Sequence, residues 1–295
     1  MTALVASSRP AGSPVPPKAT IRMRSRVAVV VKYASLVVAS LVTLTPLGVV
    51  LIASFKTNDD WSGSGPFALP VHFSFENYRT FLTKGHVVQA FVNTTIILTV
   101  SLIGTLIIGT MAAYAIDRFE FRFKKLVVLL FLLATLVPGV TTQVATFKII
   151  NSLGLFDTRW SAIVLFMGTD ILSIYIFIQF MRSIPKDLDE AAALDGAGHL
   201  TIYWRVIVPL LKPAIATVVI VKGIAIYNEF YIPFLYMPSQ DLGVISTSLF
   251  RFKGPFGAQW EVISAGVVVI VIPTLAVFLA LQRFIYNGFT AGSVK

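Results

Sequence analysis

Three ionisable side chains, Asp170, Lys222 and Glu229, lie deep inside long apolar segments of the sequence. Charged groups are costly in lipid, so such residues normally face the interior of a helix bundle or a water-filled path. For Asp170 we expect a structural ion pair with a neighbouring helix. For Lys222, a place in a polar path and a side chain that extends to the aqueous surface are equally compatible with the sequence.

Other kinds of reactive site are missing from the sequence. It has no Cys, which excludes disulfides, thiolate metal sites and a cysteine nucleophile. The three His residues, His72, His86 and His199, are too scattered for us to expect a metal site. The phosphate-binding pattern G-x-x-x-x-G-K-[ST] is also absent, so we do not expect the chain to bind ATP through such a loop.

The composition indicates a membrane protein. Of the 295 residues, 56% are hydrophobic and 13% are charged, whereas soluble domains have about 25% charged residues. Residues 87–116 contain no Asp, Glu, Lys or Arg, and about 20 apolar residues suffice to cross a bilayer. These features exclude a soluble enzyme, a secreted domain and a disordered chain. The net charge of +10 is explained by basic residues beside membrane spans, so it does not call for nucleic acid.

The element that must position these residues is the membrane helix. Six segments are long and apolar enough to span, at about 27–53, 87–116, 126–147, 160–181, 211–237 and 262–282. None alternates with a period of two, so we expect helices and an all-α fold of six transmembrane helices. In the second span, Thr105, Gly109 and Ala113 form a stripe of small residues that we interpret as a packing surface.

The positive charges predict the orientation. With the N-terminus inside, the cytoplasmic segments hold 16 Lys and Arg and the external ones hold seven, which places both termini in the cytoplasm. Residues 1–26 resemble a disordered tail. A signal peptide is the alternative, but the following apolar run is longer than such peptides use, so we expect an uncleaved first helix. The predicted membrane domain is 27–287, followed by a cytoplasmic tail at 288–295.

The most informative cytoplasmic segment, 183–209, joins the fourth and fifth spans. Ser183 is a candidate helix cap, acidic residues at 187–190 suit the positive end of a helix, and Gly196 can adopt the left-handed conformation that ends one. The run Ala191-Ala192-Ala193 makes this helix thin enough for a narrow groove in a partner. The alternative is an ordinary amphipathic helix at the membrane surface.

Here the sequence resembles the permease subunits of bacterial ATP-driven importers that depend on a binding protein. Their cytoplasmic signature is Glu-Ala-Ala, three residues, Gly, nine residues, then Ile-x-Leu-Pro. In this chain Glu190-Ala191-Ala192, Gly196 and Pro209 have that spacing, with Val206 and Val208 in place of Ile and Leu. The segments 112–122, 153–158, 227–230 and 287–295 look like the sugar-transporting branch, and most like the smaller of two permeases in maltose-type importers.

This resemblance implies a type I ATP-binding cassette (ABC) importer permease in the bacterial cytoplasmic membrane, which is not itself an enzyme. It implies four kinds of partner: a second, different permease, two ATPase subunits that carry ATP and Mg²⁺, an extracytoplasmic sugar-binding protein, and the bilayer. The residues expected to couple to the ATPases are Glu190, Ala191, Ala192, Asp195, Gly196 and Pro209. Tyr227, Asn228 and Glu229 are expected to line the path of a di- or oligosaccharide, because sugars bind to paired polar groups and aromatic faces.

Several alternatives stay open. Phe252 and Phe256, in the external loop before the sixth span, are expected to contact the binding protein by position alone, and anchoring at the membrane interface would also explain them. A proton-coupled secondary transporter would use Asp170 and Glu229 as relays. An ABC importer for another substrate is a further possibility, and so is a membrane enzyme. An enzyme would need a catalytic cluster of carboxylates or His, whereas the acidic cluster at 187–190 lies on the proposed coupling helix.

Overall fold

The computed structural model describes residues 19–168, 170–255 and 257–291. The chain divides into two units, residues 1–50 and 51–295, which are described separately. The described part of the first unit is helical and belongs to α1 (Ala19–Ala53), which begins inside the predicted N-terminal tail. Its stretch Arg26–Ala53 is long and apolar enough to cross a membrane.

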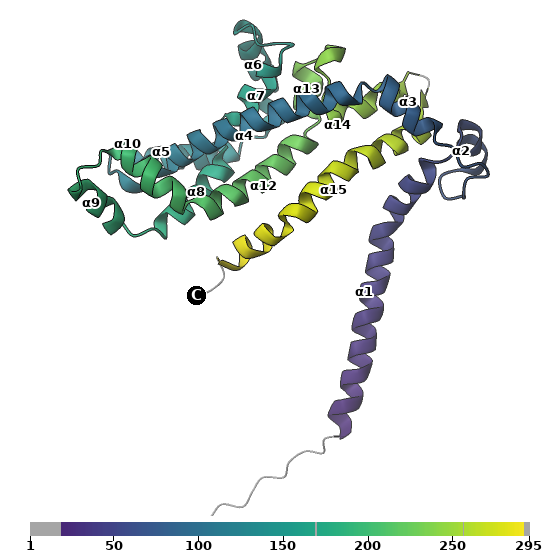
Figure 1. The fold of residues 1–295 in the computed structure, drawn as a ribbon, viewed down its shortest axis with the longest axis horizontal. Coiled ribbons are helices and arrows are strands. Elements are labelled where there is room, and N and C mark those ends of the chain that lie inside the picture. The colour runs from purple at the N-terminus through teal and green to yellow at the C-terminus, as the bar shows by residue number, and fades with distance from the viewer. Residues whose placement is uncertain (1–18, 169, 256, 292–295) are drawn as a thin grey trace, which may run out of the picture. The chain divides into compact units, whose positions relative to one another are not determined.

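The second unit is mostly helical (Figure 1). Its longer helices are α4 (Val87–Arg118), α5 (Lys124–Thr135), α6 (Gly139–Ser152), α7 (Arg159–Met167), α8 (Ile171–Arg182), α12 (Lys212–Asn228) and α15 (Trp260–Ala291). The shorter ones are α2 (Asn58–Ser64), α3 (Glu76–Lys84), α9 (Asp187–Leu194), α10 (His199–Ile202), α11 (Val208–Leu210), α13 (Tyr231–Tyr236) and α14 (Ile245–Ser248). A π-helical turn (Tyr203–Ile207) and two 3₁₀ turns (Gln240–Leu242 and Leu249–Phe252) complete the helical set. A minimal hairpin pairs β1 (Lys253–Gly254) with β2 (Gly257–Ala258).

Helix α4 is the central element of this unit. It packs against α7, α8 and α12, and α12 in turn packs against α15. The predicted small-residue stripe lies in this contact, because Thr105, Gly109 and Ala113 are all buried. A Cβ atom on Gly109 would lie 3.0 Å from the ring of Phe177 in α8, so the glycine lets the two helices approach closely. The packing interpretation of the stripe is confirmed.

Three of the apolar segments are broken where continuous helices were expected. The predicted span 126–147 is divided into α5 and α6 by Leu136–Pro138, because proline disfavours helical conformation in the residue before it. The span 160–181 is divided into α7 and α8 at Gly168–Asp170. The span 211–237 is divided into α12 and α13 at Glu229, where the Pro233 ring would clash with the Glu229 carbonyl of a continuous helix.

Within the described residues, three helical stretches meet the length and hydropathy needed to cross a membrane: Arg26–Ala53, Val87–Arg118 and Arg159–Arg182, the last across its break. The pair His199–Leu210 and Lys212–Asn228 would be a fourth if the two helices form one span bent by 72°. Trp260–Ala276 is apolar but shorter. At one end of α4 lie α9 and α10, and at the other lie α3 and α14 (Figure 1).

Candidate functional site

Helix α9 carries most of the predicted coupling residues. It begins at Asp187, and its first turn holds Asp187, Asp189 and Glu190, as the helix dipole favours. It ends before Gly196, whose φ of +82° is the predicted left-handed conformation. The predicted cap is wrong: Ser183 lies after α8 and donates to the Phe180 carbonyl, and α9 has no side-chain cap at Lys186.

The two sides of α9 have different surroundings. Ala192 turns inward and packs against the core formed by α4, α8 and α12. Glu190, Ala191 and Asp195 are exposed, and Leu194 beside them has 90% of its surface accessible. The exposed side therefore combines two acidic side chains with a small alanine and an apolar leucine. It is accessible for another protein to bind.

The chain then returns to the membrane helices through an elbow that contains Pro209. The π-helical turn at Tyr203–Ile207 leads into α11, whose first turn holds Pro209, and the direction changes by 72° before α12. Tyr203 is buried and shares a 2.7 Å hydrogen bond with the Thr110 hydroxyl of α4. The elbow and α4 are thus packed together.

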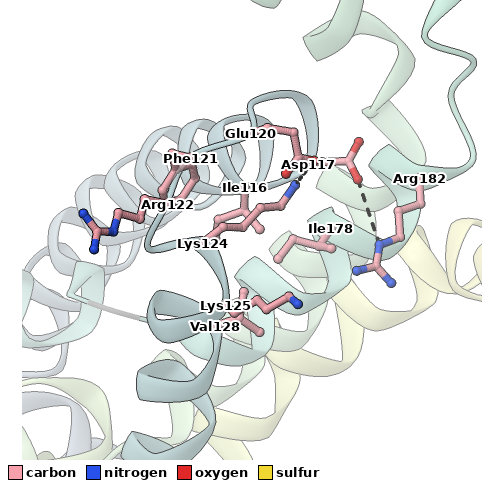
Figure 2. A pocket seen from close by; sticks show the side chains of 10 residues that line it. All are labelled: Ile116, Asp117, Glu120, Phe121, Arg122, Lys124, Lys125, Val128, Ile178 and Arg182. Atoms are coloured by element: carbon pink, nitrogen blue, oxygen red, sulfur yellow. Dashed lines mark hydrogen bonds and ion pairs between the residues drawn. The ribbon is translucent and has the colours of Figure 1, made fainter.

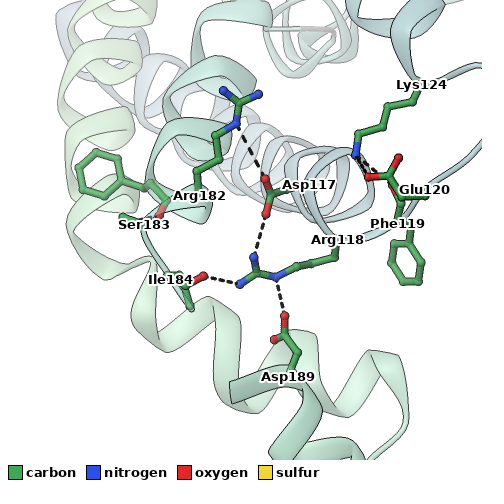
Figure 3. A network of polar contacts seen from close by, with 10 residues as sticks. Asp117, Arg118, Phe119, Glu120, Lys124, Arg182, Ser183, Ile184 and Asp189 are labelled. Carbon is green, nitrogen blue, oxygen red and sulfur yellow. Dashed lines mark hydrogen bonds and ion pairs between the residues drawn. The ribbon is translucent and has the colours of Figure 1, made fainter. Parts of the chain in front are cut away.

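An ion-pair network joins the end of α4 to α9 (Figure 3). Arg118 Nε lies 2.5 Å from Asp189 Oδ2. The same guanidinium donates to Asp117 Oδ2 at 2.8 Å and to the Ile184 carbonyl at 3.0 Å. Arg182 at the end of α8 lies 3.9 Å from Asp117. We call these groups the Arg118 network.

Apart from the exposed Arg182, the Arg118 network is largely buried. The side chains of Arg118 and Asp189 are 6% and 17% exposed. The sequence assigned Asp189 only to the acidic first turn of its helix, and the partners are about seventy residues apart. No spacing rule links residues at that separation, so the pairing could be found only in the fold.

Asp170 and Lys222 form an ion pair between the start of α8 and the middle of α12. Lys222 Nζ lies 3.4 Å from Asp170 Oδ2, and the two side chains are 19% and 18% exposed. Ser173 also donates a hydrogen bond to Asp170. The pairing of Asp170 with a neighbouring helix is confirmed, and its partner is the lysine for which the sequence left two interpretations open.

The three residues predicted to line the path lie at the break between α12 and α13. Tyr227 Oη donates to the Ile270 carbonyl of α15 at 3.2 Å. The Asn228 side chain is exposed and donates to Ile224 of its own helix. Glu229 Oε1 accepts hydrogen bonds from the backbone of Tyr231 and Ile232, so this carboxylate caps α13.

A fully buried amide, Asn93, lies toward the other end of α4. It donates to the carbonyls of Asp241 and Gly243 at 2.8 and 2.9 Å and accepts from Arg159 Nε at 2.9 Å. The sequence did not separate a packing role from a place in a pore for this residue. Its hydrogen bonds hold the segment after α13 against α4, which favours packing.

Of the two residues predicted to contact the binding protein from the last outer loop, only Phe252 is among the described residues. Phe252 is 7% exposed and its ring centroid lies 5.7 Å from that of Phe81, so its side chain packs inside the unit. Phe256 lies outside the described residues. Among the described residues, no group of three His, Cys, Asp or Glu could hold a metal ion.

The family model described as "Binding-protein-dependent transport system inner membrane component" matches residues 25–290. The chain belongs to this family. It is therefore a membrane component of a transport system, and the family's match includes α9, the elbow and the helices around α4.

Curated relatives of this permease include two bacterial sugar permeases. The melibiose/raffinose/stachyose import permease protein MelC of Bacillus subtilis is 30% identical over 254 residues, 85% of this chain and 91% of the relative. The diacetylchitobiose uptake system permease protein NgcG of Streptomyces coelicolor is 29% identical over 268 residues, 90% and 88% of the two chains.

The fold of the permease also has a solved counterpart. A chain from the crystal structure of a bacterial ABC transporter involved in the import of the acidic polysaccharide alginate superposes with a TM-score of 0.77. The match covers 92% of this chain and 99% of that chain at 21% sequence identity. At this identity the likeness establishes the helical ABC importer permease fold.

Proposed function

We propose that this chain is one permease subunit of an ATP-driven importer of di- or oligosaccharides. The observation that carries the proposal is the family match across residues 25–290 together with the exposed side of α9 at the spacing of the family's coupling signature. The sugar class comes from the relatives, whose names include import permeases for melibiose, raffinose and stachyose and for diacetylchitobiose.

In this proposal the chain crosses the bacterial cytoplasmic membrane six times with both termini inside. The excess of Lys and Arg in alternate segments supports that orientation. The domain is 27–287, with residues 1–26 and 288–295 as cytoplasmic tails. Helix α15 extends to Ala291, and residues 1–18 and 292–295 of the tails lie outside the described residues.

The coupling function belongs to α9 and the elbow. The exposed Glu190, Ala191 and Asp195 would lie in a groove of an ATPase subunit, while Ala192 and Gly196 keep the helix thin and end it. Pro209 would fix the elbow behind it. The Arg118 network ties this helix to α4, so a displacement of α9 would move the membrane helices as a rigid body.

The transport function belongs to a path shared with a second, different permease. Tyr227, Asn228 and Glu229 lie at a helix break, where polar groups can be presented to a path without an unsatisfied backbone in lipid. ATP and Mg²⁺ would bind to two partner ATPase subunits and not to this chain, which makes the chain a transport subunit rather than an enzyme.

The outer end would receive a sugar-loaded binding protein. The loop with Phe252 and Phe256 is proposed to contact it, with Phe252 supporting the loop from inside. Replacing Phe256 with Ala should reduce ATP hydrolysis stimulated by the binding protein, whereas Phe252→Leu, which keeps an apolar side chain against Phe81, should not. Equal stimulation in Phe256→Ala and wild type would favour the anchoring role.

The test of the proposed function is uptake of labelled oligosaccharide into proteoliposomes containing the chain with its partner subunits. The expected result is uptake that requires ATP and the binding protein and is unaffected by collapse of a proton gradient. Uptake driven by a proton gradient without ATP would overturn it. Uptake of amino acids but not of any sugar would refute the substrate class alone.

The proton-coupled alternative is disfavoured by how its two candidate relays are used. Asp170 is paired with Lys222 and hydrogen-bonded by Ser173, and Glu229 caps α13. A proton relay needs a carboxylate that is free to exchange protons with the transport path, whereas both carboxylates here are engaged by donors within the unit.

A further inference from the structure

A pocket of about 600 Å³ with charged and apolar lining residues lies beside the Arg118 network, between the end of α4, the start of α5 and α8 (Figure 2). Its charged lining consists of Arg122, Lys124, Lys125, Arg182, Asp117 and Glu120. The sequence used the four cations only to predict the orientation, and the coupling helix α9 does not line the pocket.

The pocket has more positive than negative charge. Lys124 lies 2.8 Å from Glu120, whose carboxyl pKa is held below its usual value first by that hydrogen bond and then by the charge of Lys124. Asp117 is shared by Arg118 and Arg182. Among the described residues, Arg122 and Lys125 have no carboxylate within 4.0 Å, so two cations in the pocket are not neutralised by ion pairs.

Two of the basic residues lie where cations are unfavourable, and within the described part of the chain only one of them, Lys124, has an anionic partner, Glu120. Lys124 and Lys125 occupy the first turn of α5, a 12-residue helix whose positive dipole end lies there and whose N-cap, Phe123, has no capping side chain. Cations at a helix N-terminus are destabilising, and a bound anion reverses that effect. The first turn of α5 is thus suited to a negatively charged group.

Beyond the pocket, α5 carries exposed apolar side chains. Leu126, Leu129, Leu130 and Leu133 follow Lys125 and are all exposed. In a membrane this surface faces hydrocarbon, either lipid chains or another protein. A phosphate attached to acyl chains would satisfy both the cations and the leucines, whereas free phosphate would satisfy only the cations.

We propose that this pocket binds the phosphate head group of an anionic membrane phospholipid, whose acyl chains lie along α5. The assignment rests on the proposed function, because that function places the pocket in the cytoplasmic leaflet. Basic pockets between membrane helices on that side are suited to such head groups.

The test uses the full-length chain purified with its partner subunits and a titration of phosphatidylglycerol monitored by native mass spectrometry. The variant is Arg122→Gln with Lys125→Gln, two exposed side chains whose loss leaves the Arg118 network intact. The matched control is Arg205→Gln with Lys212→Gln, an exposed cation of the elbow and one at the start of α12. We expect the variant to lose phosphatidylglycerol affinity by about tenfold or more and the control to keep it.

Further arms separate the possible occupants. Lys125→Arg should retain binding, phosphatidylcholine should bind far more weakly than phosphatidylglycerol, and millimolar inorganic phosphate should not displace the lipid. Equal affinity in variant and control, or displacement by inorganic phosphate, would overturn the proposal. A separate uptake measurement distinguishes the two claims. ATP-driven uptake together with equal binding of phosphatidylglycerol and phosphatidylcholine would reject only the lipid pocket. No ATP-driven uptake in either lipid would reject the importer.

Discussion

Arg118 is the residue through which three segments of the chain contact one another. Its guanidinium binds Asp117 in α4, the Ile184 carbonyl after α8 and Asp189 in α9. Arginine suits this position because its planar group offers five donors in fixed directions. A lysine would keep the charge, but it could not bind three acceptors in this geometry.

Replacing Asp189 with Asn should weaken coupling without unfolding the chain. The substitution keeps the size of the side chain but removes the charge that strengthens its contact with Arg118. We expect ATP hydrolysis stimulated by the sugar-loaded binding protein to fall by about tenfold, with Asp189→Glu near wild type. The control is Asp187→Asn, an exposed acid in the same turn. Full stimulation in Asp189→Asn would limit the network to a structural role.

The Asp170–Lys222 pair predicts a non-additive effect on stability. Lys222→Met should lower the free energy of unfolding by about 3 kcal/mol, because Asp170 loses its cationic partner and keeps only the hydrogen bond from Ser173. Adding Asp170→Asn should recover most of that loss. Thermal unfolding in detergent measures both, with Lys212→Met at the start of the same helix as control. Single and double variants of equal stability would show that the charges do not interact.

At the scale of the element, the breaks in the apolar segments define the architecture. Helix α5 has 12 residues and α7 has nine, which corresponds to roughly 18 and 14 Å at 1.5 Å per residue. A hydrocarbon core of about 30 Å needs more than either provides. Helix α7 reaches the required length only together with α8, in the stretch Arg159–Arg182.

The orientation of α9 indicates which of its alanines a partner would contact. Ala191→Phe adds bulk on the exposed side, so we expect the permease to fold normally but to retain ATPase subunits at least tenfold more weakly in a pull-down. Ala192→Phe should instead destabilise the permease itself, since Ala192 packs against the core. Ser183→Phe, at an exposed position before the helix, is the control. Undiminished retention by Ala191→Phe would reject this side of α9 as the docking surface.

The sequence predicts the left-handed helix end at Gly196, but the expected span 126–147 omits the helix break that precedes Pro138. A glycine after an acidic, alanine-rich helix predicts a left-handed end, and φ is +82°. The continuous span 126–147 was wrong because hydropathy measures side chains, whereas Pro138 acts on the backbone. The sequence offers many possible pairs of opposite charges, and Arg118–Asp189 is only one of them. The packing of α4, α8 and α9 determines that this pair forms.

At the scale of the whole molecule, the six-span topology can be tested directly, because the chain has no Cys. Ser62→Cys in α2 and Ser183→Cys after α8 introduce single exposed thiols. In intact cells an impermeant maleimide should label position 62 and not position 183, and after lysis it should label both. Labelling of position 183 in intact cells would contradict the proposed orientation.

The Asp170–Lys222 contact also imposes an order on biosynthesis. The ribosome completes Asp170 about fifty residues before Lys222, which is roughly 3 to 10 s at 5–20 residues per second. During that interval Asp170 has reached the insertion machinery, but Lys222 has not yet been synthesised. Entry of α7–α8 into lipid is therefore unfavourable until α12 has been synthesised. We expect α8 and α12 to enter the lipid as a pair.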